Sequence, residues 1–283
     1  MKRRQLKNTL LLLTMMALAT SGMAQVPVVA EEFQSPKPQL YNPRQSKVPI
    51  WLDLSGGMNF AECYDVGTIP FRYKGFGANA KGGVTIEWGR CHLRQEAQFF
   101  YNDLSDVNGS STNVNLTTEF LYRFHDASKN RWHYWAGGQV QAFVDMRDIP
   151  VLMNASWSVS AFGNLCATGM VQYDFAFNRE KTHTWLTAYG KLSLPLVGVM
   201  NRPGYAYIGN PTIEHDFLLS DNETFAKLLP GANTELGLNL NLRNGNRIGL
   251  SYHWDYLTTG KKGSYRYDNT LHAINLTFMF RIN

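Results

Sequence analysis

The 283-residue sequence carries 27 Lys and Arg residues against 22 Asp and Glu, and its isoelectric point is near 9.0. Four of these bases lie at positions 2–7, in a leader that has no acidic residues. We expect this leader to be removed, which leaves 23 bases and 22 acids. A nearly neutral chain has no basic excess with which to hold a polyanion, so we expect no nucleic-acid partner.

Residues 1–24 have the three parts of a secretory signal peptide. The basic start MKRRQLKN precedes the apolar run TLLLLTMMALA, and Gly22-Met23-Ala24 places small residues before Gln25. An apolar run of this length is too short to span a bilayer as a helix. Residues 25–47 hold prolines among polar residues, which predicts a disordered tail.

Period-two alternation of apolar and polar residues dominates from residue 48 onward, and this pattern predicts β-strands. We expect about ten strands, within a range of about eight to twelve, because one alternating stretch is long enough for two strands. The predicted strands are 50–60, 76–88, 91–101, 113–124, 132–146, 157–175, 184–196, 234–243, 247–258 and 270–282.

The charged residues of these strands fall on the polar face, and aromatic residues gather at both ends of the apolar face. A charge that faces lipid near the bilayer midplane costs roughly 2–4 kcal/mol, so a membrane barrel keeps charges off its outer face. Aromatic rings suit the headgroup zones on either side. The aromatic residues of one end are Trp88, Tyr122, Phe124, Trp132, Tyr134, Tyr173, Phe175, Phe278 and Phe280, and those of the other are Phe60, Tyr101, Trp157, Trp254 and Tyr256.

The connections alternate between short and long along the sequence. This alternation is typical of an up-and-down barrel in an outer membrane, with tight periplasmic turns and longer outer loops. A secreted soluble β-barrel or sandwich, with its apolar face inside, is the alternative. The short connections are 89–90, 125–131, 176–183 and 244–246, and the long ones are 61–75, 102–112, 147–156, 197–233 and 259–269.

The leader, the alternating strands and the final segment LHAINLTFMFRIN together resemble outer-membrane β-barrel proteins of Gram-negative bacteria. In that segment Phe278, Phe280 and Ile282 alternate, similar to the C-terminal recognition strand of such barrels, although the chain runs on to Asn283 instead of ending in Phe. The sequence most resembles Bacteroidota barrels of unassigned activity. The resemblance implies an outer-membrane location, contact with membrane lipid and lipopolysaccharide, and insertion by the barrel assembly machinery. It implies no catalytic residues.

We therefore predict an all-β fold, an up-and-down antiparallel transmembrane β-barrel that occupies residues 48–283. Residues 1–24 are its signal peptide and 25–47 a disordered periplasmic tail. Eight strands leave an interior that side chains fill, whereas 16–18 leave an open channel. A barrel of about ten strands with balanced lumenal charges should therefore have a narrow or plugged polar lumen.

Two of the predicted outer loops carry further signals. In the longest, Ser220 and Glu223 have the spacing of a capping box, which predicts a short helix. The other combines basic and aromatic residues, which suit anionic lipopolysaccharide or sugars, and a solvated loop is the alternative. These ligand-contact candidates are Lys261, Lys262, Tyr265, Arg266 and Tyr267.

The segment SYHWDY at 251–256 is the candidate for chemistry. Ser251, His253 and Asp255 alternate with aromatic residues and so share one face of a strand. If the aromatic residues face lipid, the other face is lumenal, where a membrane lipid does not easily reach it. This placement argues against a lipid hydrolase.

A second cluster comes from strand pairing. If 234–243 pairs with 247–258 through the intervening turn, opposed residue numbers sum to about 490, and Glu235 then faces Asp255. Two facing carboxylates beside His253 would suit an acid–base pair or a metal ion. The alternative is a polar ladder, in which these acids pair with Lys and Arg elsewhere in the lumen.

Two classes of function follow. We favour a structural or adhesive barrel, or one for small-solute transport, without enzymatic activity, cofactor or metal. The alternative is a membrane-embedded hydrolase with Glu235, His253 and Asp255 as its site. The sequence leaves the oligomeric state open. The three cysteines include a pair, Cys63 and Cys91, for which a disulfide is possible in an oxidising compartment.

Overall fold

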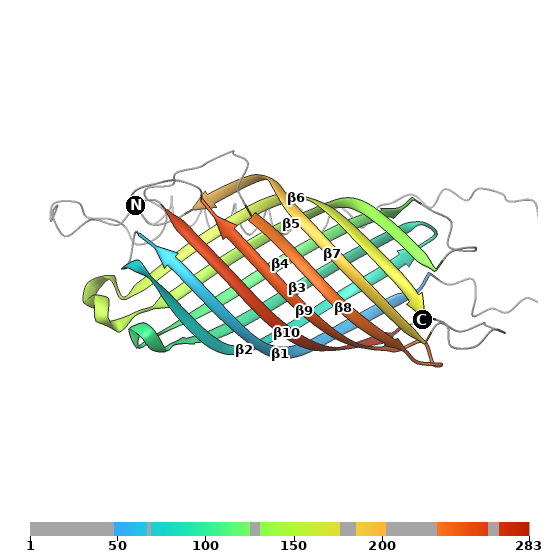
Figure 1. Cartoon of the computed structure of the whole chain (residues 1–283), viewed down its shortest axis with the longest axis horizontal. Coiled ribbons are helices and arrows are strands. Elements are labelled where there is room, and N and C mark those ends of the chain that lie inside the picture. Colours follow the sequence, from blue (N-terminus) through green and yellow to red (C-terminus); the bar gives the residue numbers. More distant parts are fainter. Residues whose placement is uncertain are drawn as a thin grey trace, which may run out of the picture.

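The computed structural model describes residues 48–66, 69–124, 131–175, 185–201, 231–259 and 266–282 (Figure 1). The predicted signal peptide, the tail and the helix at Ser220–Glu223 lie outside these residues. No helix in the described part of the chain is long and apolar enough to cross a membrane. Two short 3₁₀ helices, η1 (Ser105–Val107) and η2 (Pro150–Ala155), join strands.

The described residues form ten strands that close into one antiparallel barrel, as the sequence predicts. Each strand pairs with its neighbour in the sequence, and the first strand pairs with the last, so no edge is left exposed. The strands are β1 (Ile50–Asp65), β2 (Ile69–Trp88), β3 (Cys91–Leu104), β4 (Gly109–Arg123), β5 (Trp132–Asp148), β6 (Trp157–Phe175), β7 (Leu186–Asn201), β8 (Gly231–Asn241), β9 (Arg247–Thr258) and β10 (Tyr267–Arg281).

The two ends of the barrel differ. We call the end where β1 begins and β10 ends the terminal end, and the opposite end, which carries the connection 202–230, the loop end. Figure 1 shows η1 and η2 at the loop end and the strongly tilted strands between the two ends. An even number of strands returns the chain to the end from which it started, as in bacterial outer-membrane barrels.

The two faces of the wall have opposite chemistry. Outward side chains are apolar, as with Leu250 and Ile274, which are 54% and 58% exposed. Most lumenal side chains are polar and buried, as with Asn113 and Glu119. The aromatic residues at both ends of the outward face lie where they are predicted, and several touch across strands, as Trp132 does with Tyr173.

Several strands are longer at the loop end than predicted. The loops expected at 61–75 and 102–112 are wrong, because β1 and β2 leave only 66–68 between them, and β3 and β4 only 105–108. The extended parts keep their pairing, but their outward residues are charged, as at Arg72 and Lys74. Hydrophobic alternation therefore stops before the strand does. The predicted division into short and long connections does not hold throughout.

β7 also runs beyond its predicted end at 196, and a bulge explains the difference. Leu165 pairs with Val197, while the next residue, Cys166, pairs with Pro195. Proline has no amide hydrogen for the ladder, so a bulge is a tolerated place for it within a strand. Because the extra residue shifts the phase of the alternation, a period-two pattern read from the sequence breaks there.

Some lumenal glycines mark places where neighbouring strands approach closely. A Cβ atom on Gly77 would lie 1.7 Å from the carbonyl oxygen of Tyr101 on β3, and that oxygen is part of the sheet. By contrast, Gly163, on the outward face of β6, has nothing within 4 Å of the same position. The wall at Gly77 therefore has no room for a side chain.

We expect Gly77→Ala to lower the free energy of unfolding by about 1–3 kcal/mol, the usual cost of overpacking. Gly163→Ala is the matched control, with an expected change below about 0.5 kcal/mol. Urea unfolding of the refolded proteins in detergent micelles measures both. Equal stability of the two variants would contradict the close approach of β2 and β3.

Candidate functional site

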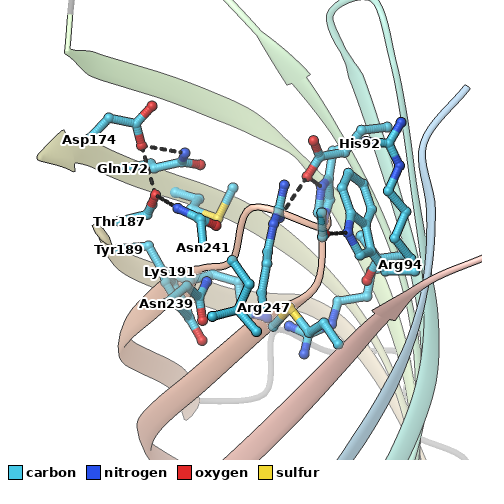
Figure 2. Close-up of a pocket in the computed structure, with 18 of the residues that line it drawn as sticks. His92, Arg94, Gln172, Asp174, Thr187, Tyr189, Lys191, Asn239, Asn241 and Arg247 are labelled. Atoms are coloured by element: carbon cyan, nitrogen blue, oxygen red, sulfur yellow. Dashed lines mark hydrogen bonds and ion pairs between the residues drawn. The ribbon is translucent and has the colours of Figure 1, made fainter. Parts of the chain in front are cut away.

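The lumen has three levels. At the loop end it is closed by a buried cluster that we call the loop-end plug. In the middle it is crossed by ion pairs, here called the central charge network. At the terminal end it opens into a cavity of about 580 Å³, the terminal-end cavity (Figure 2).

The loop-end plug surrounds Arg147. The guanidinium carbon of Arg147 lies 5.6 Å from the ring centre of Tyr73 and 4.9 Å from that of Tyr267. The guanidinium donates to Asp65 at 3.2 Å and to Asp145, so its charge is matched within the plug. The apolar members of the plug are Cys63, Tyr73, Leu104, Val107, Phe143, Ile149, Phe162, Met200, Leu257 and Tyr267.

The plug spans the full width of the barrel. The hydroxyl of Tyr267 on β10 donates to Asp145 on β5 at 2.8 Å, and these strands are five positions apart in either direction around the barrel. Tyr267 and Tyr73 are fully buried. A buried arginine is stable only with close partners, and here it has two carboxylates and two aromatic faces.

The central charge network is organised around Glu235 on β8. Its carboxylate lies 3.1 Å from the amine of Lys191, 3.8 Å from that of Lys81 and 3.6 Å from the guanidinium of Arg94. The hydroxyl of Tyr189 also donates to it, at 2.7 Å. Because β3 and β8 are opposite strands, the pair formed by Arg94 and Glu235 crosses the whole lumen.

Other acids complete the network around the same three cations. Glu96 lies 2.7 Å from Arg94, Glu119 lies 3.1 Å from Lys191, and Asp53 lies 3.8 Å from Arg94. Asp53, Lys81, Glu119, Lys191 and Glu235 are buried, and the side chains of Arg94 and Glu96 are only 12% and 14% exposed. Glu235 therefore pairs with cations from other strands, as in the polar ladder that the sequence left open, whereas Asp255 does not within the described part of the chain.

The predicted pairing of Glu235 with Asp255 is wrong by two residues. Glu235 lies opposite His253, and Asp255 lies opposite Asn233. The hairpin turn explains the shift. The amide of Gly245 donates to the carbonyl of Leu242, and Gly245 has a positive φ of 89°, so Asn244 is the centre of the hairpin instead of Gly245.

The structure places His253 opposite Glu235 on the neighbouring strand. The Nε2 atom of His253 lies 3.4 Å from the amide nitrogen of Asn233, and Asp255 accepts a hydrogen bond from Gln141 at 3.3 Å. The cavities beside His253 and beside Asp255 each hold about 10 Å³, room for a single water molecule. No group of three metal-binding side chains occurs among the residues that the structure describes.

Ser251 shares the lumenal face with His253, as the sequence predicts, and both are buried. On the opposite face, the rings of Trp254 and Tyr256 stack with their centres 6.4 Å apart. Ser251 lies opposite Gly237 and Asn275, in a layer of small and amide side chains. The segment is therefore a strand with a polar inner and an aromatic outer face.

The terminal-end cavity is lined by side chains from most of the barrel wall. Figure 2 shows His92 and Arg94 on one side and Gln172, Asp174 and Thr187 on the other, all directed toward the hollow. The floor of the cavity is the central charge network, since Arg94 and Lys191 belong to both. The remaining polar lining consists of Thr85, Glu87, Glu119, Tyr189, Asn239, Asn241, Arg243, Asn244, Arg247 and Arg281.

The turn between β8 and β9 lies across the mouth of this cavity. The indole nitrogen of Trp51 on β1 donates to the carbonyl of Gly245 at 3.1 Å, and the amide of Arg281 on β10 donates to the side chain of Asn246 at 3.0 Å. The guanidinium carbon of Arg247 lies 4.1 Å from the ring centre of Trp51. These contacts hold the turn in one position.

At the loop end, Glu62 on β1, Arg72 and Lys74 on β2, and Arg266 just before β10 form a group that we call the outer-rim patch. Arg72 lies 2.7 Å and Lys74 3.9 Å from Glu62, and the two cationic side chains are 64% and 55% exposed against 26% for the carboxylate. Arg266 lies over the ring of Tyr64, 5.2 Å from its centre. The cations therefore point away from the barrel.

The predicted ligand-contact residues divide into three groups. Lys261, Lys262 and Tyr265 lie outside the described residues. Arg266 is half-exposed, and its hydrogen bonds to Asp268 raise the pKa of the guanidinium above its ordinary value. Tyr267 is not available to an external ligand, because it is fully buried in the loop-end plug.

Sequence reasoning missed Arg147, Tyr73 and Tyr189. Arg147 could have been found, because it continues the lumenal alternation from Asp145. Tyr73 lies within 61–75, a segment predicted to be a loop, and nothing in the sequence indicates that Tyr189 faces an acid on β8. The possible disulfide between Cys63 and Cys91 does not form, because these residues lie at opposite ends of the barrel and all three cysteines are free.

No family model matches the sequence, and no curated protein matches it either. Among solved structures, the outer membrane protease OmpT from Escherichia coli is similar, with a TM-score of 0.51 and 9% identity over 83% of this chain and 97% of that chain. This chain has the fold of an outer-membrane β-barrel. At this low sequence identity, the structural similarity to OmpT shows the fold alone.

Two further barrels match less well. Neisserial surface protein A has a TM-score of 0.35 at 9% identity, over 81% of this chain and 97% of that one. The translocator domain of the autotransporter NalP from Neisseria meningitidis has a TM-score of 0.37 at 9% identity, over 83% and 89%. Neither similarity tests the resemblance to Bacteroidota barrels, which stays a prediction.

We expect Lys191→Met to lower the free energy of unfolding by about 3–5 kcal/mol, because it leaves Glu119 and Glu235 without their shared cation in a buried site. Asp255→Asn is the matched control, since Asp255 has no cationic partner among the described residues, and its effect should stay below about 1 kcal/mol. Urea unfolding in micelles measures both. Similar losses in the two variants would contradict a network centred on Glu235.

Proposed function

We propose that this protein is a closed outer-membrane barrel with a structural or adhesive role, and not an open pore. The observation that carries the proposal is the filling of the lumen at two separate levels, each held by an interaction between opposite strands. Tyr267 reaches Asp145 in the loop-end plug, and Arg94 reaches Glu235 in the central charge network. Between these levels the described cavities hold about 10 Å³ each.

The same geometry disfavours the other two roles. Transport of a solute would require the plug and the network to open together, with the loss of several buried ion pairs. Hydrolysis would require an accessible base, yet Glu235 is held by three cations and His253 has room for only one water molecule beside it. No feature of the described residues favours a hydrolase.

We expect the refolded protein to show no regular conductance steps in planar lipid bilayers, because side chains of the described residues fill the lumen at the plug and at the network. Arg147→Ala should stay closed as well, since it disturbs only the plug. An open porin, refolded in the same detergent, is the positive control. Steady conductance of the unmodified protein would overturn the proposal.

The outer-rim patch suggests the partner at the cell surface, lipopolysaccharide. Its cations lie just beyond an aromatic zone, in which Phe60 pairs with Phe76 across β1 and β2. Aromatic rings occupy the headgroup level of a membrane, so Arg72 and Lys74 lie where lipid phosphates are. This contact belongs to the proposed structural or adhesive role.

We expect Arg72→Gln combined with Lys74→Gln to weaken binding to lipopolysaccharide micelles roughly tenfold or more, since each base near an anionic surface contributes about 1 kcal/mol. Arg90→Gln with Arg131→Gln, at the other end of the barrel, is the control with the same change of charge. Titration in a zwitterionic detergent measures both. Equal affinities of the two double variants would show that the patch does not bind lipopolysaccharide.

A further inference from the structure

We infer that the terminal-end cavity is a binding site, open to the periplasm, for a phosphate group carried by a polyhydroxylated molecule. The proposal goes beyond a structural role and does not depend on it. Periplasmic turns and termini lie at the same end of bacterial barrels, which assigns the mouth of the cavity to the periplasm. A volume of about 580 Å³ lies within the usual range for small-molecule sites.

The mouth of the cavity carries a net positive charge, because three arginines there outnumber the carboxylates of Glu87 and Asp174. Arg243, Arg247 and Arg281 line it, all from the turn between β8 and β9 or from the strand ends beside it. Glu87 lies 3.6 Å from Arg247 and neutralises the charge of that arginine. Arg243 has no acidic partner among the described residues. Guanidinium groups bind phosphate through paired hydrogen bonds, and a positive mouth draws an anion in.

The wall suits the rest of such a ligand. Hydroxyl and amide side chains line it, including those of Thr187, Asn239 and Asn241, and they both donate and accept hydrogen bonds. Asn241 already donates to Thr187 at 3.0 Å, and Thr187 donates to Asp174 at 3.0 Å, so the wall is ordered (Figure 2). A sugar or glycerol group offers hydroxyls that match this lining.

The cavity is preformed and ends blindly. The bonds from Trp51 to Gly245 and from Arg281 to Asn246 fix the turn that carries Arg243. At the floor, Arg94 and Lys191 are already paired with Glu96 and Glu119. A ligand therefore enters from the periplasm and leaves the same way, so the site retains a molecule instead of transporting it.

The first test measures calorimetric binding of glucose 6-phosphate to the full mature chain, refolded in a zwitterionic detergent. We expect saturable binding of one molecule per barrel and none of glucose. Arg243→Gln combined with Arg281→Gln should weaken binding roughly tenfold or more, as expected when charged hydrogen bonds to a phosphate are lost. Arg90→Gln with Arg131→Gln changes the same charge at the same end outside the cavity lining and should leave the affinity unchanged.

A second arm distinguishes the source of the phosphate. Short-chain phosphatidylglycerol carries its phosphate on a lipid headgroup, and glucose 6-phosphate carries it on a free sugar. If the lipid binds more tightly, with the same sensitivity to Arg243→Gln and Arg281→Gln, the site holds a headgroup from the inner leaflet. Tighter binding of glucose 6-phosphate identifies a soluble periplasmic ligand.

The proposal is overturned if neither probe binds saturably at concentrations up to about 10 mM, a range that includes very weak sites. It is also overturned if binding is the same in both double variants, because the phosphate would then bind elsewhere. Migration of each unboiled variant on SDS gels confirms that the barrel has folded, so a loss of binding is not a loss of fold.

Discussion

The ion pairs that join opposite walls are the interactions on which the rest of the lumen depends. Apolar side chains fill only part of the lumen of this ten-stranded barrel. The charged side chains in the rest of the lumen are removed from bulk water. Such charges are stable only when each has a close partner of opposite sign. Glu235 is the acidic partner of Lys81, Lys191 and Arg94 together. Its ion pair with Arg94 joins β8 to the opposite strand, β3.

The strands and their two faces could be predicted from the sequence, whereas the contacts within the lumen could not. Alternation is a local property, and a membrane imposes it strictly, so the bounds of β9 (Arg247–Thr258) are the predicted ones. Which residues meet across the barrel depends on its stagger, which is a property of all ten strands. The approach of Arg94 to Glu235 has no local signal for this reason.

The candidate site shows how sensitive such inference is to register. A hairpin centred on Gly245 gives two facing carboxylates, and a hairpin centred on Asn244 gives Glu235 opposite His253. The difference comes from the left-handed conformation of a single glycine after a tight turn. A shift of two residues keeps every side chain on the same face of the strand, so the hydrophobic pattern does not reveal the error.

The turn between β8 and β9 also bears on the order in which the barrel forms. It is bonded to Trp51 on the first strand and to Arg281 on the last, residues that meet only when β1 pairs with β10. The bond from Trp51 therefore forms no earlier than closure of the seam. The turn is thus bonded to both strands of the seam, and the mouth of the terminal-end cavity takes its final shape only in a complete barrel.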